Sequence, residues 1–265
     1  MIERSIPIRL DDNPRYAGSI HDDAVARRMG YRAALVPGAF LYGHFSRLAV
    51  DLWGMDWISR GAIGIRFRRA VYNGDTVLLS ARPLPDADGA RLALSMTGAE
   101  GEEVATGWIA LPATAPAAPA ASACPLLPLP DPRPVITAGG LRPGMRGGTA
   151  QEILTRAEIA DSLRAFGEDH PLYEGGGLAH SGCLMRKAMF ELNRSFALPG
   201  PYVLTACEGR HFGAARAGGR FAGSSVITAV HERKGRHYFE THETVLIDNV
   251  AVAEFHRVQI YAASE

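Results

Sequence analysis

The sequence of 265 residues predicts an α+β fold in which one small domain occurs twice. In each half, an apolar helical run that opens at a Gly is followed by four apolar, strand-like runs in the same order. The halves are separated by residues 113–134, which are dense in Pro and Ala. Because Pro lacks an amide donor and fixes φ, this segment is expected to be an extended surface linker. We therefore assign residues 1–112 and 135–265 to the N-terminal and C-terminal domains.

Similar residue patterns support the duplication. Residues 65–75 resemble residues 211–220, and residues 100–105 resemble residues 248–253, a turn leading into an apolar strand in both cases. The matched pairs in this alignment are Phe67 with Phe212, Gly74 with Gly219, and the helix start at Gly38 with that at Gly182.

The expected elements follow from periodicity and from turn residues. A short helix is expected near residues 22–30, with acidic residues in its first turn and Gly30 at its end. The longer helices are expected at 37–53 and 182–194, and the strands at 61–68, 76–82, 91–98, 104–111, 204–212, 220–232, 236–247 and 252–261.

Composition excludes several classes of function. Lys plus Arg equals Asp plus Glu at 28 each, so no net field attracts nucleic acid or an acidic membrane surface. The three cysteines include no CxxC pair, which argues against a disulfide framework and a thiolate metal site. No signal peptide and no run of about 18 apolar residues is found, so a soluble, cytoplasmic protein is expected. Dinucleotide, P-loop, serine-hydrolase and HExxH motifs are lacking, and no cofactor or metal is expected.

The order of elements and several short motifs resemble the MaoC-like branch of the dehydratase and hydratase superfamily, in its double-hotdog form. That family has an entry loop D-x-N-P-x-H, a Pro-Gly or His-Gly that opens the central helix, and a later F-x-x-P-V-x-x-G-D. The matching stretches here are residues 16–23, 36–38 and 67–75 in the first half, and residues 168–173 and 179–182 in the second. The fold implied is a double hotdog, with two long central helices wrapped by antiparallel sheets.

The resemblance implies an Asp and His pair, but neither half carries it complete. In the first half His21 stands at the His position, and Tyr16 stands where Asp is expected. In the second half Glu168 stands at the Asp position, and Tyr173 replaces the His. We therefore expect the two copies to have diverged and to share at most one active pocket.

The resemblance implies reversible addition of water to an enoyl thioester, with acid–base proton transfer. The predicted catalytic residues are His21, Glu168, Asp169, His170 and Tyr173. The predicted substrate-binding residues are Tyr16, Gly38, His180, Gly182, Arg66 and Arg68. A helix amide near Gly38 or Gly182 would polarise the thioester carbonyl, and the basic strand with Arg66 and Arg68 would neutralise phosphates of a CoA or carrier arm. There are structural alternatives to these roles. His21 could cap the helix that follows it, and the arginines could lie on a solvated face of their strand.

Three functions remain open. The first is a MaoC-like lyase acting on an acyl thioester or a related unsaturated acid. The second is a diverged hotdog enzyme that catalyses another elimination, a cyclisation or an isomerisation, which Tyr173 favours because a phenol is a better acid than base. The third is a non-catalytic acyl-binding module. The expected partner is a small molecule, CoA- or carrier-linked, with no nucleic acid or membrane, and the chain is expected as a monomer or homodimer.

Overall fold

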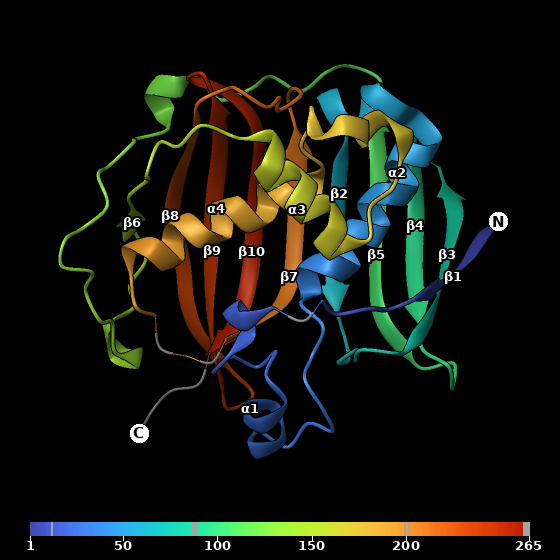
Figure 1. The fold of residues 1–265 in the computed structure, drawn as a ribbon, viewed down its shortest axis with the longest axis horizontal. Helices are drawn as coiled ribbons and strands as arrows, with labels where there is room; N and C mark the ends of the chain where they lie inside the picture. The colour runs from blue at the N-terminus through green and yellow to red at the C-terminus, as the bar shows by residue number, and fades with distance from the viewer. Residues whose placement is uncertain (12, 86–88, 199, 201, 262–265) are drawn as a thin grey trace.

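The computed structural model describes residues 1–11, 13–85, 89–198, 200 and 202–261. Within these residues, ten strands form one antiparallel sheet (Figure 1). The strands are β1 (Ile2–Pro7), β2 (Ala62–Phe67), β3 (Thr76–Leu84), β4 (Gly89–Thr97), β5 (Glu103–Pro112), β6 (Arg146–Gly147), β7 (Tyr202–His211), β8 (Phe221–Arg233), β9 (Arg236–Ile247) and β10 (Val250–Tyr261). The α-helices are α1 (Asp23–Arg28), α2 (Gly38–Arg60), α3 (Arg156–Phe166) and α4 (Ser181–Ser195), and the short 3₁₀ helices include η1 (Pro14–Tyr16) and η4 (Pro171–Gly176).

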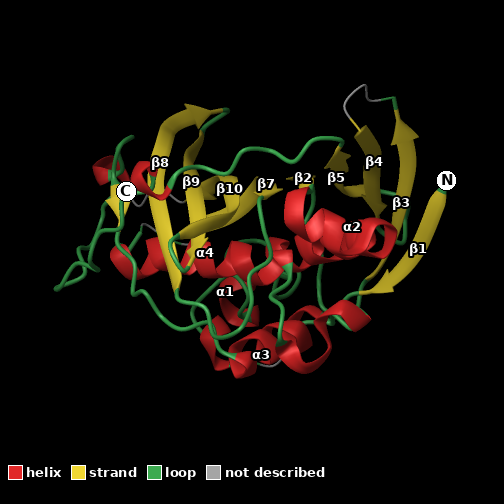
Figure 2. Cartoon of the chain, turned by 90° about the horizontal axis from the view of Figure 1, so that it is seen from above, coloured by secondary structure: helices red, strands yellow, loops and turns green. Residues whose placement is uncertain are grey.

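The two halves join at the centre of the sheet. The strand order is β1-β3-β4-β5-β2-β7-β10-β9-β8-β6, so β2 of the first half pairs with β7 of the second. Ile65 lies opposite Cys207 in this antiparallel pair. Figure 2 shows α2 and α4 on one side of the sheet, with α3 in a further layer beyond them. Each central helix therefore lies between the sheet and the loops that cover it.

The core lies between the sheet and the helix layer. Tyr42, Phe45 and Trp57 of α2 are completely buried, and most of the helix before Val50 is enclosed by protein. Full burial of each such side chain contributes roughly 1.5–3 kcal/mol. The helix is interrupted at Gly54, where the backbone has a non-helical φ of 53°. The predicted helix 37–53 therefore corresponds to the part before this break.

Equivalent hydrogen bonds show that the alignment of residues 65–75 with residues 211–220 was wrong by one residue, whereas the match of Val104 with Val252 was right. Arg68 and Arg69 both donate their backbone N–H to Val104, at 2.8 and 3.3 Å, respectively. In the second half, Phe212 and Gly213 donate to Val252 at 2.8 and 3.3 Å. Arg68 thus corresponds to Phe212, and Phe67 corresponds to His211.

The same shift applies to the turn and to the helix start. Asp75 N–H donates to Tyr72, and Gly219 N–H donates to Arg216. The turn glycines that correspond are therefore Gly74 and Gly218, with φ of 87° and 93°. The positive φ, which favours Gly, falls at Gly218 rather than at the adjacent Gly219. Val36 N–H donates to Val71, and Ala179 N–H makes the equivalent hydrogen bond to Ala215. Gly38 and Ser181 each lie two residues further on, so these two helix starts correspond.

The linker contacts the second half. Cys124 is buried against Ala222 and Leu246, and Ser224 Oγ donates to the carbonyl of Pro125 at 3.0 Å. The expected extended course thus includes local anchor points on β8 and β9. Among the described residues, no helix is both long and apolar enough to span a bilayer.

Candidate active site

The two entry loops have the same capping geometry. Asn13 Oδ1 accepts a hydrogen bond from the N–H of Arg15 at 3.1 Å, and a Pro follows Asn13 as the first residue of η1. His170 Nδ1 accepts from the N–H of Leu172 at 3.1 Å, and a Pro again opens η4. Asn13 and His170 are therefore equivalent. Three residues on, Tyr16 and Tyr173 are equivalent too.

This equivalence corrects the motif assignment in the first half. Tyr16 was aligned with the family's Asp, and His21 with its His. The geometry instead puts Asp11 at the acid position and Tyr16 at the His position, because Asp11 lies two residues before Asn13, as Glu168 lies two before His170. A Tyr therefore occupies the His position in both halves, and His21 is an additional residue.

Asp11 and Tyr16 form a direct pair. Tyr16 Oη donates to Asp11 Oδ1 at 2.7 Å, and Arg15 Nη2 donates to Tyr16 Oη at 3.3 Å. Burial, more than any neighbouring charge, raises the pKa of the Tyr16 hydroxyl, so this group is neutral at physiological pH. The sequence comparison missed Asp11, although reading the loop motif from Asn13 and Pro14 would have found it.

The imidazole of His21 is fixed by one backbone bond. Its Nδ1 lies 2.6 Å from the carbonyl oxygen of Leu35. Because a carbonyl only accepts, Nδ1 carries the proton, and Nε2 is left as the basic nitrogen of a neutral ring. The Tyr16 ring packs edge-on at a centroid distance of 5.6 Å. Burial lowers the pKa of His21, and the positive charges of Arg186 and Arg15 lower it further.

Arg186 brings the second half to this site. It lies on α4 and is 8% exposed, and its charge lowers the pKa of both His21 and His180 after the larger effect of burial. The first-half loop also contacts β7, since Val203 packs with Ile20 and Leu35. Arg186 was not predicted as a site residue, because helical periodicity does not distinguish it from an arginine at the edge of the helix.

The acidic groups of the second entry loop are used in ion pairs with α2. Arg47 Nη1 lies 2.7 Å from Glu168 Oε1 and also contacts Asp169. The Glu168 side chain is 5% exposed, and that of Asp169 is 87% exposed. His170, whose Nδ1 caps η4, has its Nε2 3.7 Å from Asp51 on α2. Glu168, Asp169 and His170 thus lie together, but with Arg47 rather than with His21.

Tyr173 and His180 are buried beside one another. Their ring centroids are 6.0 Å apart, and Tyr173 is 2% exposed. The Tyr173 hydroxyl forms no hydrogen bond with any described residue, and burial raises its pKa strongly. His180 Nε2 lies 2.9 Å from Ser162 Oγ, and burial lowers the pKa of His180 to about 3. His180 is therefore a neutral partner of Ser162 at the start of α4.

The two helix-start glycines have different surroundings. A Cβ on Gly38 would lie 3.3 Å from the ring of Phe67, which is a tight contact. A Cβ on Gly182 would lie 2.4 Å from Phe166, so Gly182 is required for the packing of that ring against α4. Gly38 begins α2 three residues after Leu35, whose carbonyl oxygen accepts from His21.

Arg66 and Arg68 are not part of this cluster. Ile63 and Ile65 of β2 face the core, so Arg66 points to the opposite face of the sheet. It lines a hollow of about 440 Å³ together with Trp108 and Glu208. Arg68 is exposed, with its Nε 3.5 Å from Glu103.

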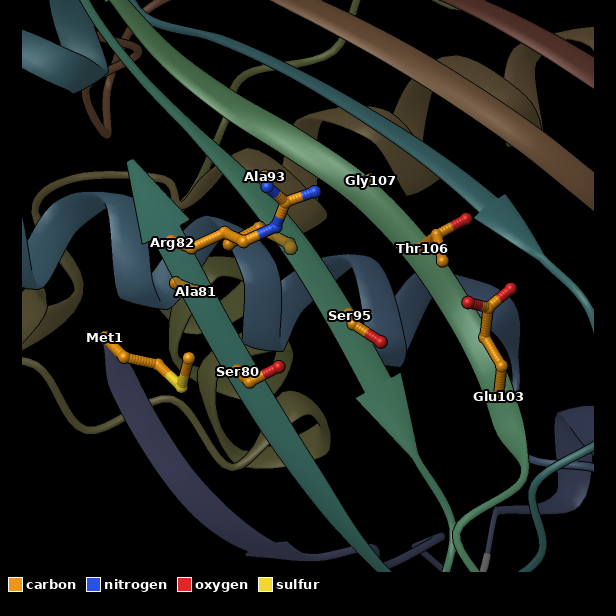
Figure 3. A pocket seen from close by; sticks show the side chains of 10 residues that line it. Met1, Ser80, Ala81, Arg82, Ala93, Ser95, Glu103, Thr106 and Gly107 are labelled. Carbon is orange, nitrogen blue, oxygen red and sulfur yellow. The ribbon is translucent and has the colours of Figure 1, made fainter. Parts of the chain in front are cut away.

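A second hollow of about 310 Å³ also opens on the outer face, where Ser80, Arg82 and Thr106 line it (Figure 3). Figure 3 shows α2 behind the strands, on the other side of the sheet from these side chains. Neither hollow contains a predicted catalytic residue. Among the described residues, no group of three or more His, Cys, Asp or Glu side chains is arranged to hold a metal ion.

Comparison with solved structures identifies the architecture. A protein from Chloroflexus aurantiacus, described as a MaoC domain dehydratase, matches with a TM-score of 0.61 and 14% identity, covering 100% of this chain and 96% of that chain. A conserved hypothetical protein of Mycobacterium tuberculosis, described as having a double hotdog fold, matches with a TM-score of 0.60 and 14% identity, covering 97% and 95%. This chain has a double hotdog fold.

The double hotdog match extends beyond dehydratases. A protein from Lactobacillus plantarum described as an oleoyl thioesterase matches with a TM-score of 0.51 and 11% identity, covering 99% of this chain and 96% of that chain. No family model matches the sequence. No curated protein matches it either. The predicted fold class and the structural resemblance to MaoC-like dehydratases are confirmed, while the reaction is a separate question.

Proposed function

We propose that this double hotdog protein is a lyase that adds water to, or removes it from, an acyl thioester by acid–base proton transfer. The observation that carries the proposal is the fixed tautomer of His21, whose Nδ1–H donates to Leu35 and leaves Nε2 as a base. The full-length structural match to MaoC-like dehydratases supports the reaction class.

His21 is suited to the role of general base. Its lowered pKa keeps the ring neutral near pH 7, so Nε2 can accept a proton. Nε2 makes no hydrogen bond to any described residue. It is also not one of the described side-chain nitrogen and oxygen atoms that are shielded from solvent and lack a hydrogen-bond partner. It is therefore open to water or substrate.

In the hydration direction, His21 Nε2 takes a proton from water while the oxygen of that water bonds to the β-carbon. The electron pair of the double bond moves toward the thioester, and negative charge develops on its oxygen. The imidazolium then returns the proton to the α-carbon, which completes the addition of H and OH. Tyr16 acts as a positioning residue, since its ring packs on His21 and its hydroxyl is held by Asp11.

The start of α2 offers donors for the developing oxyanion. The N–H groups of Gly38 and Ala39 have no hydrogen-bond acceptor among the described residues, whereas Phe40 N–H already donates to Pro37. The first amides of a helix also carry the positive end of its dipole. In the proposed site, these amides stabilise the thioester oxygen in the transition state.

The second entry loop is a weaker candidate for the reaction. Glu168 and Asp169 are both held in ion pairs with Arg47, and the Tyr173 hydroxyl is too weak an acid in the folded protein to ionise near pH 7. We therefore assign the second loop a structural role, with the reaction at the first loop alone.

The test is to incubate the protein with trans-2-enoyl-CoA thioesters of several chain lengths. Loss of the conjugated double bond is followed by absorbance, the 3-hydroxyacyl product by mass spectrometry, and free CoA by a thiol reagent. We expect hydration without CoA release, unchanged in His256→Ala on the outer face. CoA release without hydration would assign thioester hydrolysis instead, and absence of both products at every chain length would refute an enzymatic role on thioesters.

A further inference from the structure

A buried arginine without a counter-charge lies beside the proposed site. Arg186 is 8% exposed, yet its guanidinium forms no hydrogen bond or ion pair with any described residue. Arg257, which is also deeply buried, is paired with Glu243 and also donates to Gln259. The structure thus compensates one buried guanidinium with a carboxylate and leaves the other without one.

Aromatic rings surround Arg186. Its guanidinium carbon lies 5.5, 5.6 and 5.4 Å from the ring centroids of Phe40, Phe166 and Phe190, respectively. Each such contact offsets only a small part of the free-energy cost of removing a cation from water. The cost for a buried ion is larger than the three contacts supply, so the rings compensate it in part.

The carboxylate of Asp11, whose charge raises the pKa of Arg186, does not pair with it. The Asp11 carboxylate accepts from Tyr16 and lies 3.6 Å from Arg15, and no ion pair joins it to Arg186. With Arg15 and Asp11 balancing each other, the Arg186 charge is in excess around His21. Burial lowers the pKa of Arg186 to about 10, which still leaves it charged at pH 7.

Its nitrogens remain accessible to a ligand. A guanidinium nitrogen that was shielded from solvent and had no hydrogen-bond partner would be a buried unsatisfied atom, and no nitrogen of Arg186 is one. The remaining solvent exposure of Arg186 therefore includes its guanidinium. The planar guanidinium matches the two oxygens of a carboxylate. The phosphates of CoA are unsuitable partners here, because a bulky, strongly hydrated group would have to enter a cage of three phenylalanine rings.

We propose that Arg186 binds a carboxylate on the acyl chain of the substrate, so that the preferred substrate is the monothioester of an unsaturated dicarboxylic acid. This inference rests on the proposed function, since it places the acyl chain between His21 and α4. It defines a specificity determinant that the hydration step itself does not require.

The first experiment measures binding without turnover. CoA thioethers that carry a carboxyalkyl chain or an alkyl chain of equal length are titrated by calorimetry, over several chain lengths. The wild-type protein is expected to prefer the carboxyalkyl ligand by about 10- to 100-fold, the range for one charge-assisted hydrogen-bonded pair. Arg186→Met should abolish this preference, Arg186→Lys should retain part of it, and Arg164→Met, on an exposed part of α3, should leave it intact.

Stability distinguishes ligand binding from a structural role. Because Arg186 has no ionic or hydrogen-bonding partner to lose, and the apolar Met side chain can pack against the three rings, the Tm of Arg186→Met without ligand should equal or exceed that of the wild type. A clear fall in Tm, together with equal affinity of the wild type for both ligands, would overturn the inference. A carboxylate preference without hydration of any thioester would support the Arg186 site while refuting the proposed lyase.

The second experiment compares the kcat/KM of an enoyl-CoA that ends in a carboxylate with that of one that ends in a methyl group. Arg186→Met should lower the ratio of the two values by about 10- to 100-fold. An equal loss for both substrates would contradict the inference, because Arg186 would then act on the thioester itself. Binding of the free dicarboxylate that depends on Arg186 would support the carboxylate site and identify the free acid as its source.

Discussion

Tyr16 donates a hydrogen bond of 2.7 Å to Asp11, whereas its counterpart Tyr173 makes no hydrogen bond to Glu168 or to any other described residue. The difference arises because Arg47 of α2 holds Glu168 instead. The same loop motif thus forms a polar pair beside His21 in one half and an ion pair with the neighbouring helix in the other. The two halves share one fold but differ in the contacts that this loop makes.

Replacing Tyr16 by Phe should lower kcat/KM for hydration by about tenfold, because the loop residue that packs on His21 loses its bond to Asp11. It should also cost about 0.5–1.5 kcal/mol of stability. The matched variant Tyr173→Phe removes an unbonded hydroxyl and should leave both quantities close to the wild type. Steady-state kinetics and urea unfolding measure these effects, and a larger kinetic loss in Tyr173→Phe would contradict the assignment.

The pH profile of hydration should have its acid limb below pH 6.5. The base must be neutral, and burial with the charges of Arg186 and Arg15 lowers the pKa of His21 below its ordinary value of 6.5. Activity should therefore rise with pH through that lowered pKa and be constant through neutrality. An acid limb in kcat/KM centred above 6.5 would exclude His21 as the neutral base in the free enzyme.

Glu168→Gln should destabilise the protein by about 1–3 kcal/mol, because it disrupts a charge-assisted bond to Arg47 at a nearly buried position. Asp169→Asn removes a carboxylate that contacts the same arginine, but its side chain is 87% exposed. This control should change stability by less than about 0.5 kcal/mol. Chemical denaturation of both variants provides the comparison, and equal losses would show that burial of Glu168 is unimportant.

Stability should fall as the pH falls below about 6.5. Burial lowers the pKa of His180 to about 3 and that of His211 to about 4, so the unfolded chain takes up protons that the folded chain does not. At pH values well below 6.5 but above these lowered pKa values, each histidine reduces the free energy of unfolding by roughly 1.4 kcal/mol for every unit by which the pH falls. Denaturation at about pH 7 and about pH 5 tests this.

The histidine variants provide the control for that measurement. His180→Gln and His211→Gln should each make the dependence of stability on pH less steep, because the amide does not titrate. His211 is linked through Ser181, at 2.9 Å, to the Tyr42 hydroxyl, so its variant will also lower stability at neutral pH. An unchanged slope in both variants would indicate that other groups cause the acid sensitivity.

Much of the fold was predictable because its elements have strong periodicity. The apolar runs gave eight of the strands and both central helices. The helix α3 was missed, although Thr155 and Glu158 form an N-terminal capping signal and Gly167 ends the helix with φ of 62°. The edge strand β1 was missed because charged residues interrupt its apolar positions, and β6 is only two residues long.

The site was less predictable, since it depends on contacts between distant segments. The motif was assigned five residues too late in the first half, because His21 matched the expected residue type while Tyr16 did not. The capping geometry of Asn13 showed the correct position, which the Asn13-Pro14 pair also marks in the sequence. Arg186 could not have been found by its spacing, because its significance lies in the absence of a counter-charge among the described residues.

The most direct test of the account compares the hydration activity of His21→Asn and His170→Asn. In the first variant, the amide can still donate to Leu35, but no base remains at the position of Nε2. In the second, the amide oxygen can cap η4 as Asn13 caps η1. We predict a loss of at least about 100-fold in kcat/KM for His21→Asn and wild-type activity for His170→Asn; full activity in His21→Asn would contradict the central claim.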